Sequence, residues 1–279
     1  MKILKSTLIL ILILPFLLFP MSVSADNTHT IDLEFDSPSP QYLSHADNSN
    51  LDLTSSLTVE LWANFESDTG ANMGLVNKNT FADPSSSGHR AYSFYYQGST
   101  DELAVVLNNC SAQTEFSRAW VPTLGTWYRI TLLLDGTNTA IYIDGAQQGA
   151  TTSSAVTPCN SDAPLEVGSL NAGSGPFDGF IDEVRLFSKA RYPTDANQEI
   201  CDDEDNLQAY WKLNDALTNS ASSTLTLTNN NSAVFQTGDL PFTTDSCAAP
   251  APAAVPQRKR VIIINYLDKP KLLSELKWI

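Results

Sequence analysis

Short segments in which apolar and polar residues alternate recur along the chain between turn signals, and long stretches with a helical period are nearly absent. Residues 31–36 (IDLEFD) and 57–65 (LTVELWANF) show the alternation most clearly. A two-residue period places successive side chains on opposite faces of a strand. We therefore expect an all-β chain, with further strands at residues 91–97, 102–108, 127–135, 139–144, 165–169, 180–187, 207–213 and 225–228.

Residues 127–145 (WYRITLLLDGTNTAIYIDG) carry two Asp-Gly pairs, the sequence that tight hairpin turns favour, and predict two successive hairpins. One or two helical turns are expected after Pro193 as a connector. About a dozen strands favour one large sandwich or jelly roll over several small modules. We assign it to residues 26–248; the Ala/Pro linker and basic tail of residues 249–279 have no assigned role.

The first 25 residues have the order of a secretory signal peptide. Lys2 and Lys5 precede an apolar run over residues 8–19, and the segment ends in Val23-Ser24-Ala25. The run is shorter than the roughly 20 apolar residues of a membrane-spanning helix. Cleavage after Ala25 and a secreted or cell-surface location are therefore expected, with an uncleaved anchor as the alternative.

The exported chain keeps four cysteines, Cys110, Cys159, Cys201 and Cys247. An even number in an oxidising compartment predicts disulfides. Three pairings are possible, and we favour Cys110–Cys159 with Cys201–Cys247 because each bridge then closes a loop within one region of the sequence. Zinc is disfavoured, because the chain has no CxxC pair and no Cys/His cluster.

Charge is distributed unevenly. Residues 26–248 carry a net charge of −21, and the tail carries +4. An acidic body repels nucleic acid and anionic lipid, so neither is expected as a partner. It is compatible with divalent cations, neutral sugars or basic proteins, and equally with simple solubility.

Four segments together resemble laminin-G-like domains of the concanavalin A-like jelly-roll superfamily. They are residues 33–65, the hairpins within residues 125–149, the FDGFIDEVRLFSKAR segment at 177–191, and the LQAYWKLND segment that begins at Leu207. The resemblance implies a two-sheet antiparallel β-sandwich that binds glycans or proteins, and it covers residues 30 to 240. Some relatives bind calcium. The Glu-x-Asp-x-x-Glu signature of the glucanase branch and the pentraxin signature are both missing.

Several aromatic residues are candidates for ligand binding. Trp62 alternates with the core positions of its strand and shares a face with Glu60 and Asn64. On an open face the indole could stack on a sugar while its neighbours form hydrogen bonds; on a covered face it is core. Trp120 and Tyr95 lie near loops rich in Ser, Gly and Asn, where binding residues usually occur.

Calcium is a possible cofactor of this acidic chain. Asp178, Asp182 and Glu183 offer carboxylate oxygens, with Asp47 and Asp52 as more distant candidates, although no EF-hand spacing is present. A structural role for Asp182 is the alternative. In residues 181–184 (IDEV) a strict two-residue period cannot turn both Ile and Val inward, so we expect a β-bulge or burial on both faces.

Catalysis is not expected. Asp32, Glu34 and Asp36 place three carboxylates on one strand face, but no His or Tyr nearby completes an acid/base set, and no nucleophile elbow or phosphate loop occurs. We therefore expect an exported, non-catalytic module that recognises carbohydrate or glycoprotein. The alternatives are a divergent glycoside hydrolase using Asp32, Glu34 or Glu60, and a structural or adhesive surface protein.

Overall fold

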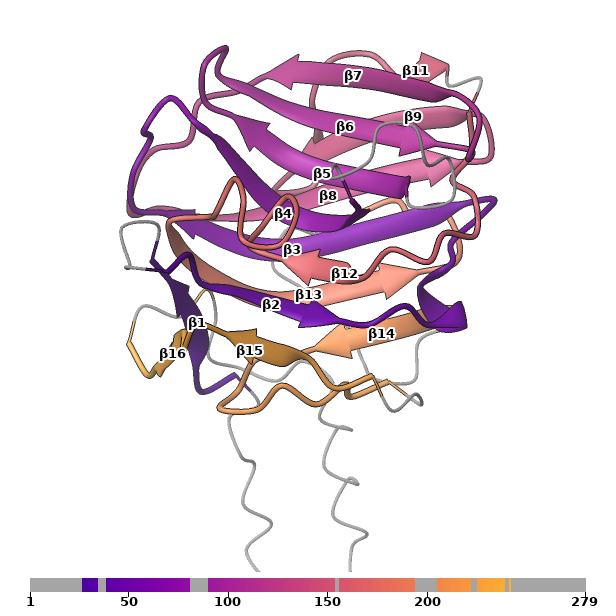
Figure 1. The fold of residues 1–279 in the computed structure, drawn as a ribbon. Helices are drawn as coiled ribbons and strands as arrows, with labels where there is room; N and C mark the ends of the chain where they lie inside the picture. Colours follow the sequence, from indigo (N-terminus) through magenta and orange to yellow (C-terminus); the bar gives the residue numbers. More distant parts are fainter. Residues whose placement is uncertain are drawn as a thin grey trace, which may run out of the picture. The chain divides into compact units, whose positions relative to one another are not determined.

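Two antiparallel β-sheets face each other in the computed structural model, and their inner sides share one apolar core (Figure 1). The structure describes residues 27–34, 39–80, 90–153, 156–193, 205–221, 225–238 and 241. Within these ranges the only helical element is the 3₁₀ turn η1 (Ser49–Leu51). The all-β prediction and the two-sheet architecture are confirmed.

The larger sheet has nine strands: β1 (Thr30–Leu33), β3 (Leu57–Phe65), β8 (Trp127–Asp135), β9 (Asn138–Ile143), β10 (Ala146–Gln147), β11 (Thr152–Ser153), β13 (Gly179–Phe187), β14 (Leu207–Trp211) and β16 (Val234–Gln236). Their order is β10-β9-β8-β3-β13-β1-β16, with β11 beside β9 and β14 beside β13. Strands β1 and β14 pair with successive parts of β13.

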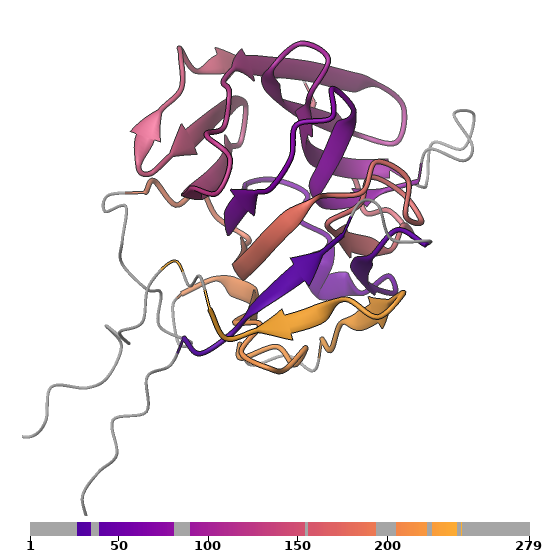
Figure 2. The ribbon, with the colours of Figure 1, turned by 90° about the vertical axis from the view of Figure 1, so that its left-hand side faces the viewer.

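The smaller sheet has seven strands: β2 (Tyr42–His45), β4 (Asn72–Asn79), β5 (Arg90–Gln97), β6 (Glu102–Asn108), β7 (Gln113–Ala119), β12 (Leu165–Val167) and β15 (Thr228–Asn230). Their order is β15-β2-β12-β4-β5-β6-β7, and this sheet lies in front in Figure 1. The side view shows β15, in orange, against β2, in violet, so distant parts of the sequence close this sheet (Figure 2).

The central strand β3 is buried on both of its faces. Val59, Leu61 and Ala63 belong to the core between the sheets, as their alternation predicts. The outward residues are buried as well. Over Thr58 lies the chain after β13: the Thr58 hydroxyl donates to the Lys189 carbonyl and accepts from the Arg191 amide, both at 2.8 Å.

The expected bulge in β13 is confirmed. Asp182 lies opposite Trp62 while Arg185 lies opposite Glu60, so β13 has one extra residue here. The extra residue is accommodated at Glu183, whose φ is +53°. A left-handed conformation at a non-glycine residue is unfavourable, so other contacts must stabilise it.

Strand boundaries agree best where the pattern is strongest. The strands at residues 102–108 and 127–135 have the predicted limits, and the strand expected at 225–228 is replaced by β15. The strands that were not predicted are β2, β4, β7, β10, β11 and β16. The helical connector expected after Pro193 falls on residues 194–200, outside the described residues.

The disulfide between Cys110 and Cys159 is confirmed, with 5.7 Å between the Cα atoms. It joins the end of β6 to the segment that leads towards β12, where the Cys159 amide also donates to the Asn108 carbonyl at 3.0 Å. Cys201 and Cys247 lie outside the described residues, as do the predicted signal peptide and the basic tail. In the described ranges, no helix has the length and apolar character needed to cross a membrane.

Candidate functional site

The three residues predicted to form a glycan platform lie together on β3, and all three are buried. Trp62 exposes 4% of its surface, and Glu60 and Asn64 expose 1% each. A sugar ring needs an open aromatic face on which to stack, and this face is covered. The arrangement is that of a buried layer, and ligand binding by Trp62 stays a prediction.

Glu60 belongs to a buried ionic network on the outer side of the nine-stranded sheet. Its Oε1 lies 3.2 Å from Arg185 Nη1, and its Oε2 lies 3.5 Å from Arg129 Nε. Arg185 also pairs with Glu183 and donates to the Tyr210 hydroxyl at 3.0 Å. Glu60 is therefore a counter-ion shared by two buried arginines, and Glu183 is the second counter-ion of Arg185.

The network also explains the bulge. Glu183, at the left-handed position, pairs with Arg185 and accepts a hydrogen bond from the Tyr210 hydroxyl. Burial disfavours the charged form of Arg185, but Tyr210, Glu183 and Glu60 outweigh that effect and raise its pKa, so the guanidinium stays charged. Burial raises the pKa of Tyr210 as well. Neither group titrates near neutral pH.

The predicted calcium ligands are not brought together. Asp178 and Asp182 are four residues apart along an extended segment, which separates them by about 13 Å at 3.3 Å per residue. Asp182 is fully buried and accepts a hydrogen bond from Asn27 at 2.8 Å, while Asp178 accepts one from the Ser67 hydroxyl. These two residues do not fit one shared calcium ion, and the described part of the chain holds no group of three His, Cys, Asp or Glu side chains suited to a metal.

The carboxylates of the hydrolase alternative are also dispersed. Asp32, on β1, accepts a hydrogen bond from Gln236 of β16 at 3.2 Å. Burial raises its pKa, and the charge of Asp178 adds to that rise. Glu34 is exposed just beyond β1, and Asp36 lies outside the described residues. Glu60 is held on the neighbouring part of the sheet by its arginines.

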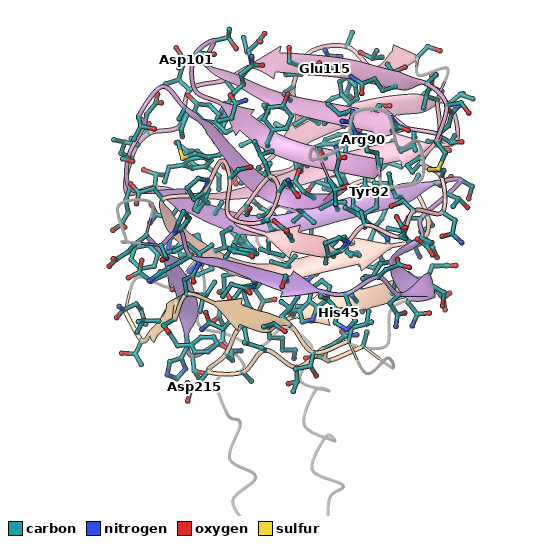
Figure 3. All side chains as sticks on the ribbon, in the orientation of Figure 1. His45, Arg90, Tyr92, Asp101, Glu115 and Asp215 are labelled. Atoms are coloured by element: carbon teal, nitrogen blue, oxygen red, sulfur yellow. A yellow bond between two sulfur atoms is a disulfide. The ribbon has the colours of Figure 1, made fainter. Side chains whose placement is uncertain are left out.

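Tyr95 lies on the outer face of the seven-stranded sheet. It exposes 7% of its surface, packs beside Ala104 and Val106 with Leu170 over it, and donates from its hydroxyl to Glu115 at 2.8 Å. Figure 3 labels Glu115 at β7. Tyr95 is therefore on a different surface from Trp120.

Trp120 begins the loop that connects the two sheets at the end of β7. Its amide donates to the Asp101 carbonyl at 2.9 Å. Its half-buried ring packs edge-on against Phe65, Tyr96 and Tyr128, with centroid distances of 5.7, 6.2 and 5.0 Å. These contacts fix the start of the loop against the core.

The same loop exposes apolar side chains. Val121 is 61% exposed and Leu124 is 48% exposed. They are two of the four large apolar side chains that the described residues leave exposed. The backbone of the loop is held on both sides of Leu124, because the Thr123 amide donates to the Tyr128 hydroxyl and the Gly125 amide donates to the Phe65 carbonyl. The two side chains project from an ordered loop.

Two exposed carboxylates complete this edge of the sandwich. The hydroxyl of Tyr96 lies 3.0 Å from Asp101 and 3.3 Å from Asp68, and Figure 3 labels Asp101 at the edge. Burial, together with both carboxylates, raises the pKa of Tyr96, so its hydroxyl remains a proton donor. We name this surface the 120 rim: Asp68, Asp101, Trp120, Val121 and Leu124.

Sequence reasoning found Trp120 and missed the other four residues of the 120 rim. A usable signal was present: the WVPTLGT segment puts two aliphatic residues among turn residues, outside any alternating pattern. Apolar residues that neither period explains are candidates for exposure.

Several solved structures are similar to this chain. A "putative carbohydrate binding protein" from Bacteroides ovatus ATCC 8483 superposes with a TM-score of 0.59 at 20% identity, over 75% of this chain and 60% of that one. A heptameric SAP-like pentraxin from Limulus polyphemus has a TM-score of 0.49 at 13% identity, over 75% of this chain and 95% of that one. Domains LG4-5 of the mouse laminin alpha1 chain have a TM-score of 0.42 at 13% identity, over 62% and 47%.

This chain thus spans about three fifths of the length of the Bacteroides protein. No curated protein matches it significantly in sequence. The family model Laminin_G_3 matches residues 38–197, which is more than half of the chain. The predicted resemblance is confirmed: the chain belongs to the concanavalin A-like lectin/glucanase superfamily, in its laminin-G-like branch.

Proposed function

We propose that this protein is an exported, non-catalytic binding module that recognises carbohydrate or glycoprotein through the 120 rim. The observation that carries the proposal is the exposure of Val121 and Leu124, at 61% and 48%, from a loop whose backbone is hydrogen-bonded to the core. An ordered, exposed apolar group beside polar groups is the usual composition of a recognition surface.

The chemistry of the 120 rim suits a sugar. The half-exposed Trp120 with its two aliphatic neighbours can cover the apolar face of a pyranose ring. The exposed carboxylates of Asp68 and Asp101 can accept hydrogen bonds from hydroxyl groups, and charged acceptors make the stronger bonds. A glycoprotein would present the same hydroxyls together with basic residues, which suit the acidic body.

Other features support the remaining parts of the proposal. The Cys110–Cys159 bridge is the kind of bond that persists in oxidising compartments, which favours export. The Bacteroides neighbour is described as carbohydrate-binding. Glu60, the most central of the proposed hydrolase carboxylates, is engaged with two arginines, whereas a retaining hydrolase needs two free carboxyls about 5 Å apart.

The test is a glycan and glycoprotein array probed with the full-length chain from an exporting host, beside a Val121→Ser/Leu124→Ser variant. Losing the contact of one such side chain removes about 1.5–3 kcal/mol, so we expect binding to weaken at least tenfold. Val234→Ser is the matched control, because Val234 is 54% exposed on β16, and it should bind within twofold of the wild type.

Equal binding by the double variant and the wild type would refute the 120 rim as the site. Absence of binding to every glycan and glycoprotein would refute carbohydrate recognition itself. Hydrolysis of a bound glycan, detected by mass spectrometry of the supernatant, would favour the glycoside hydrolase instead.

A further inference from the structure

A lysine is completely buried near the end of β4. Lys78 has a side-chain exposure of 0%, and its ammonium is surrounded by four oxygen atoms. They are Asp47 Oδ1 at 2.6 Å, Asp52 Oδ1 at 3.3 Å, and the carbonyl oxygens of Ser161 and Ala163 at 2.5 and 2.9 Å. Lysine is almost never buried unless it is paired, so this arrangement needs an explanation.

The oxygen set is richer than one ammonium requires. An ammonium has three protons to donate, and four oxygens lie around it. Two aspartates also place two negative charges beside one positive charge. Two carboxylates and two backbone carbonyls are the ligand types that calcium takes in proteins, where it accepts six to eight oxygens, water included.

The ammonium connects parts of the chain that are distant in sequence. Asp47 and Asp52 flank η1 in the loop after β2, while Ser161 and Ala163 precede β12. Figure 1 shows η1 near the ends of β2 and β12. A bound cation can stabilise a fold in the same way, by holding together loops that are distant in sequence.

We propose that the Lys78 ammonium takes the place of a divalent cation at this edge, so that the two loops are held together without calcium. While the lysine is present, its charge and its side chain exclude a metal ion. Removal of the side chain leaves two carboxylates and two carbonyls facing a space that solvent can reach, because Asp47 is 38% exposed. Such a variant should bind calcium.

The experiment measures thermal unfolding of the full chain in EDTA and in a calcium series, for the wild type and for Lys78→Ala. The wild type should unfold at the same temperature throughout. Lys78→Ala should unfold at a lower temperature in EDTA and recover with saturable calcium dependence, by roughly 5–10 °C when calcium exceeds its Kd about a hundredfold. Magnesium should be less effective, because it demands a tighter octahedral geometry.

Controls separate this site from general effects of charge. Lys189→Ala removes a half-buried lysine elsewhere and should show no calcium effect. Adding Asp52→Asn to Lys78→Ala should abolish most of the recovery, because one carboxylate is lost. If Lys78→Ala does not fold in EDTA, refolding in calcium, magnesium or neither replaces melting, and recovery in calcium alone is the expected result.

Two outcomes would overturn the proposal. One is a calcium-dependent shift of equal size in the wild type and in Lys78→Ala. The other is a destabilised Lys78→Ala variant that no calcium concentration rescues, since the oxygen set would then have no affinity for a cation. Ligand binding is not measured in this experiment, so its result stands apart from the array.

Discussion

Glu60 pairs with two buried arginines, so we assign it a structural role as their counter-ion. We predict that Glu60→Gln destabilises the protein strongly and leaves ligand binding unchanged. The substitution preserves the shape of the side chain and removes its charge. It therefore leaves Arg129 and Arg185 buried, with 2% and 0% exposure, and with one counter-ion fewer.

The magnitude follows from the burial of the pair. Removing one member of a buried ion pair destabilises a protein by about 3–5 kcal/mol, because the remaining charge stays desolvated. The glutamine carbonyl can still accept from Arg185, and Arg185 keeps its pair with Glu183, so the loss should fall near the lower limit. About 3 kcal/mol corresponds to a fall of roughly 6–12 °C in Tm for a domain of this size.

The assay is urea unfolding followed by tryptophan fluorescence, together with the array for binding. Glu115→Gln is the control, because Glu115 is an exposed carboxylate, and it should change stability by less than about 1 kcal/mol. A loss of less than about 1 kcal/mol in Glu60→Gln would refute the buried-pair argument. A variant of normal stability that no longer binds or cleaves a glycan would place Glu60 in a functional site.

Three further outcomes follow from buried contacts. Burial, and next the neighbouring Glu183 carboxylate, raise the pKa of Asp182, so the folded state keeps a proton that the unfolded state releases above about pH 4. Wild-type stability should thus fall as pH rises from 4 to 7.5, whereas Asp182→Asn lacks this titrating group. In urea unfolding, the free energy of unfolding of Asp182→Asn should therefore rise relative to that of the wild type over this pH range; a constant difference would contradict this. Replacing both Cys110 and Cys159 by serine opens a loop of 49 residues and should remove about 4 kcal/mol in the same assay, whereas a loss under about 1 kcal/mol would contradict the chain-entropy estimate. Gly74→Ala should lower Tm by roughly 4 °C or more, because the new Cβ would lie 2.2 Å from loop backbone, while Gly238→Ala meets open space and should leave Tm unchanged; equal Tm values for the two would refute the close approach.

The alternating pattern of β3 predicted which residues face the core, but it could not predict that the residues on the outer face are buried too. Alternation reports that one side of a strand is apolar, and it leaves open what covers the other side. At Thr58 the cover comes from the chain after β13: Thr58 contacts Lys189 and Arg191, more than 130 positions away in the sequence. A contact at that separation leaves no local signal.

The two longest strands that the sequence failed to predict, β4 and β7, have physical reasons for their weak patterns. Strand β4 has two register shifts, and it turns Lys78, a charged residue, into the buried oxygen set. Strand β7 lies at the edge of its sheet and keeps several residues exposed. Both strands therefore lack the apolar alternation on which the sequence argument depends.

The sequence was also a limited guide to the candidate binding sites. The residue types and their alternation indicated a glycan platform at Trp62 and a calcium pair at Asp178 and Asp182. In the folded chain, however, the burial of each side chain and its neighbours determine whether it can bind a ligand. Val121 and Leu124 are of residue types that do not by themselves indicate binding. They are functional candidates only because the fold leaves them exposed.

Three of the carboxylates that look functional in the sequence, Glu60, Asp47 and Asp52, share one feature: each has a basic side chain of the same chain beside it. A carboxylate that is neutralised internally is poorly placed to bind a substrate or a metal, since a ligand would first have to displace a desolvated charge. By contrast, Asp68 and Asp101 share the neutral hydroxyl of Tyr96, and both residues lie at an exposed edge. The difference in partners, rather than in residue type, favours the 120 rim as the surface that remains available for recognition.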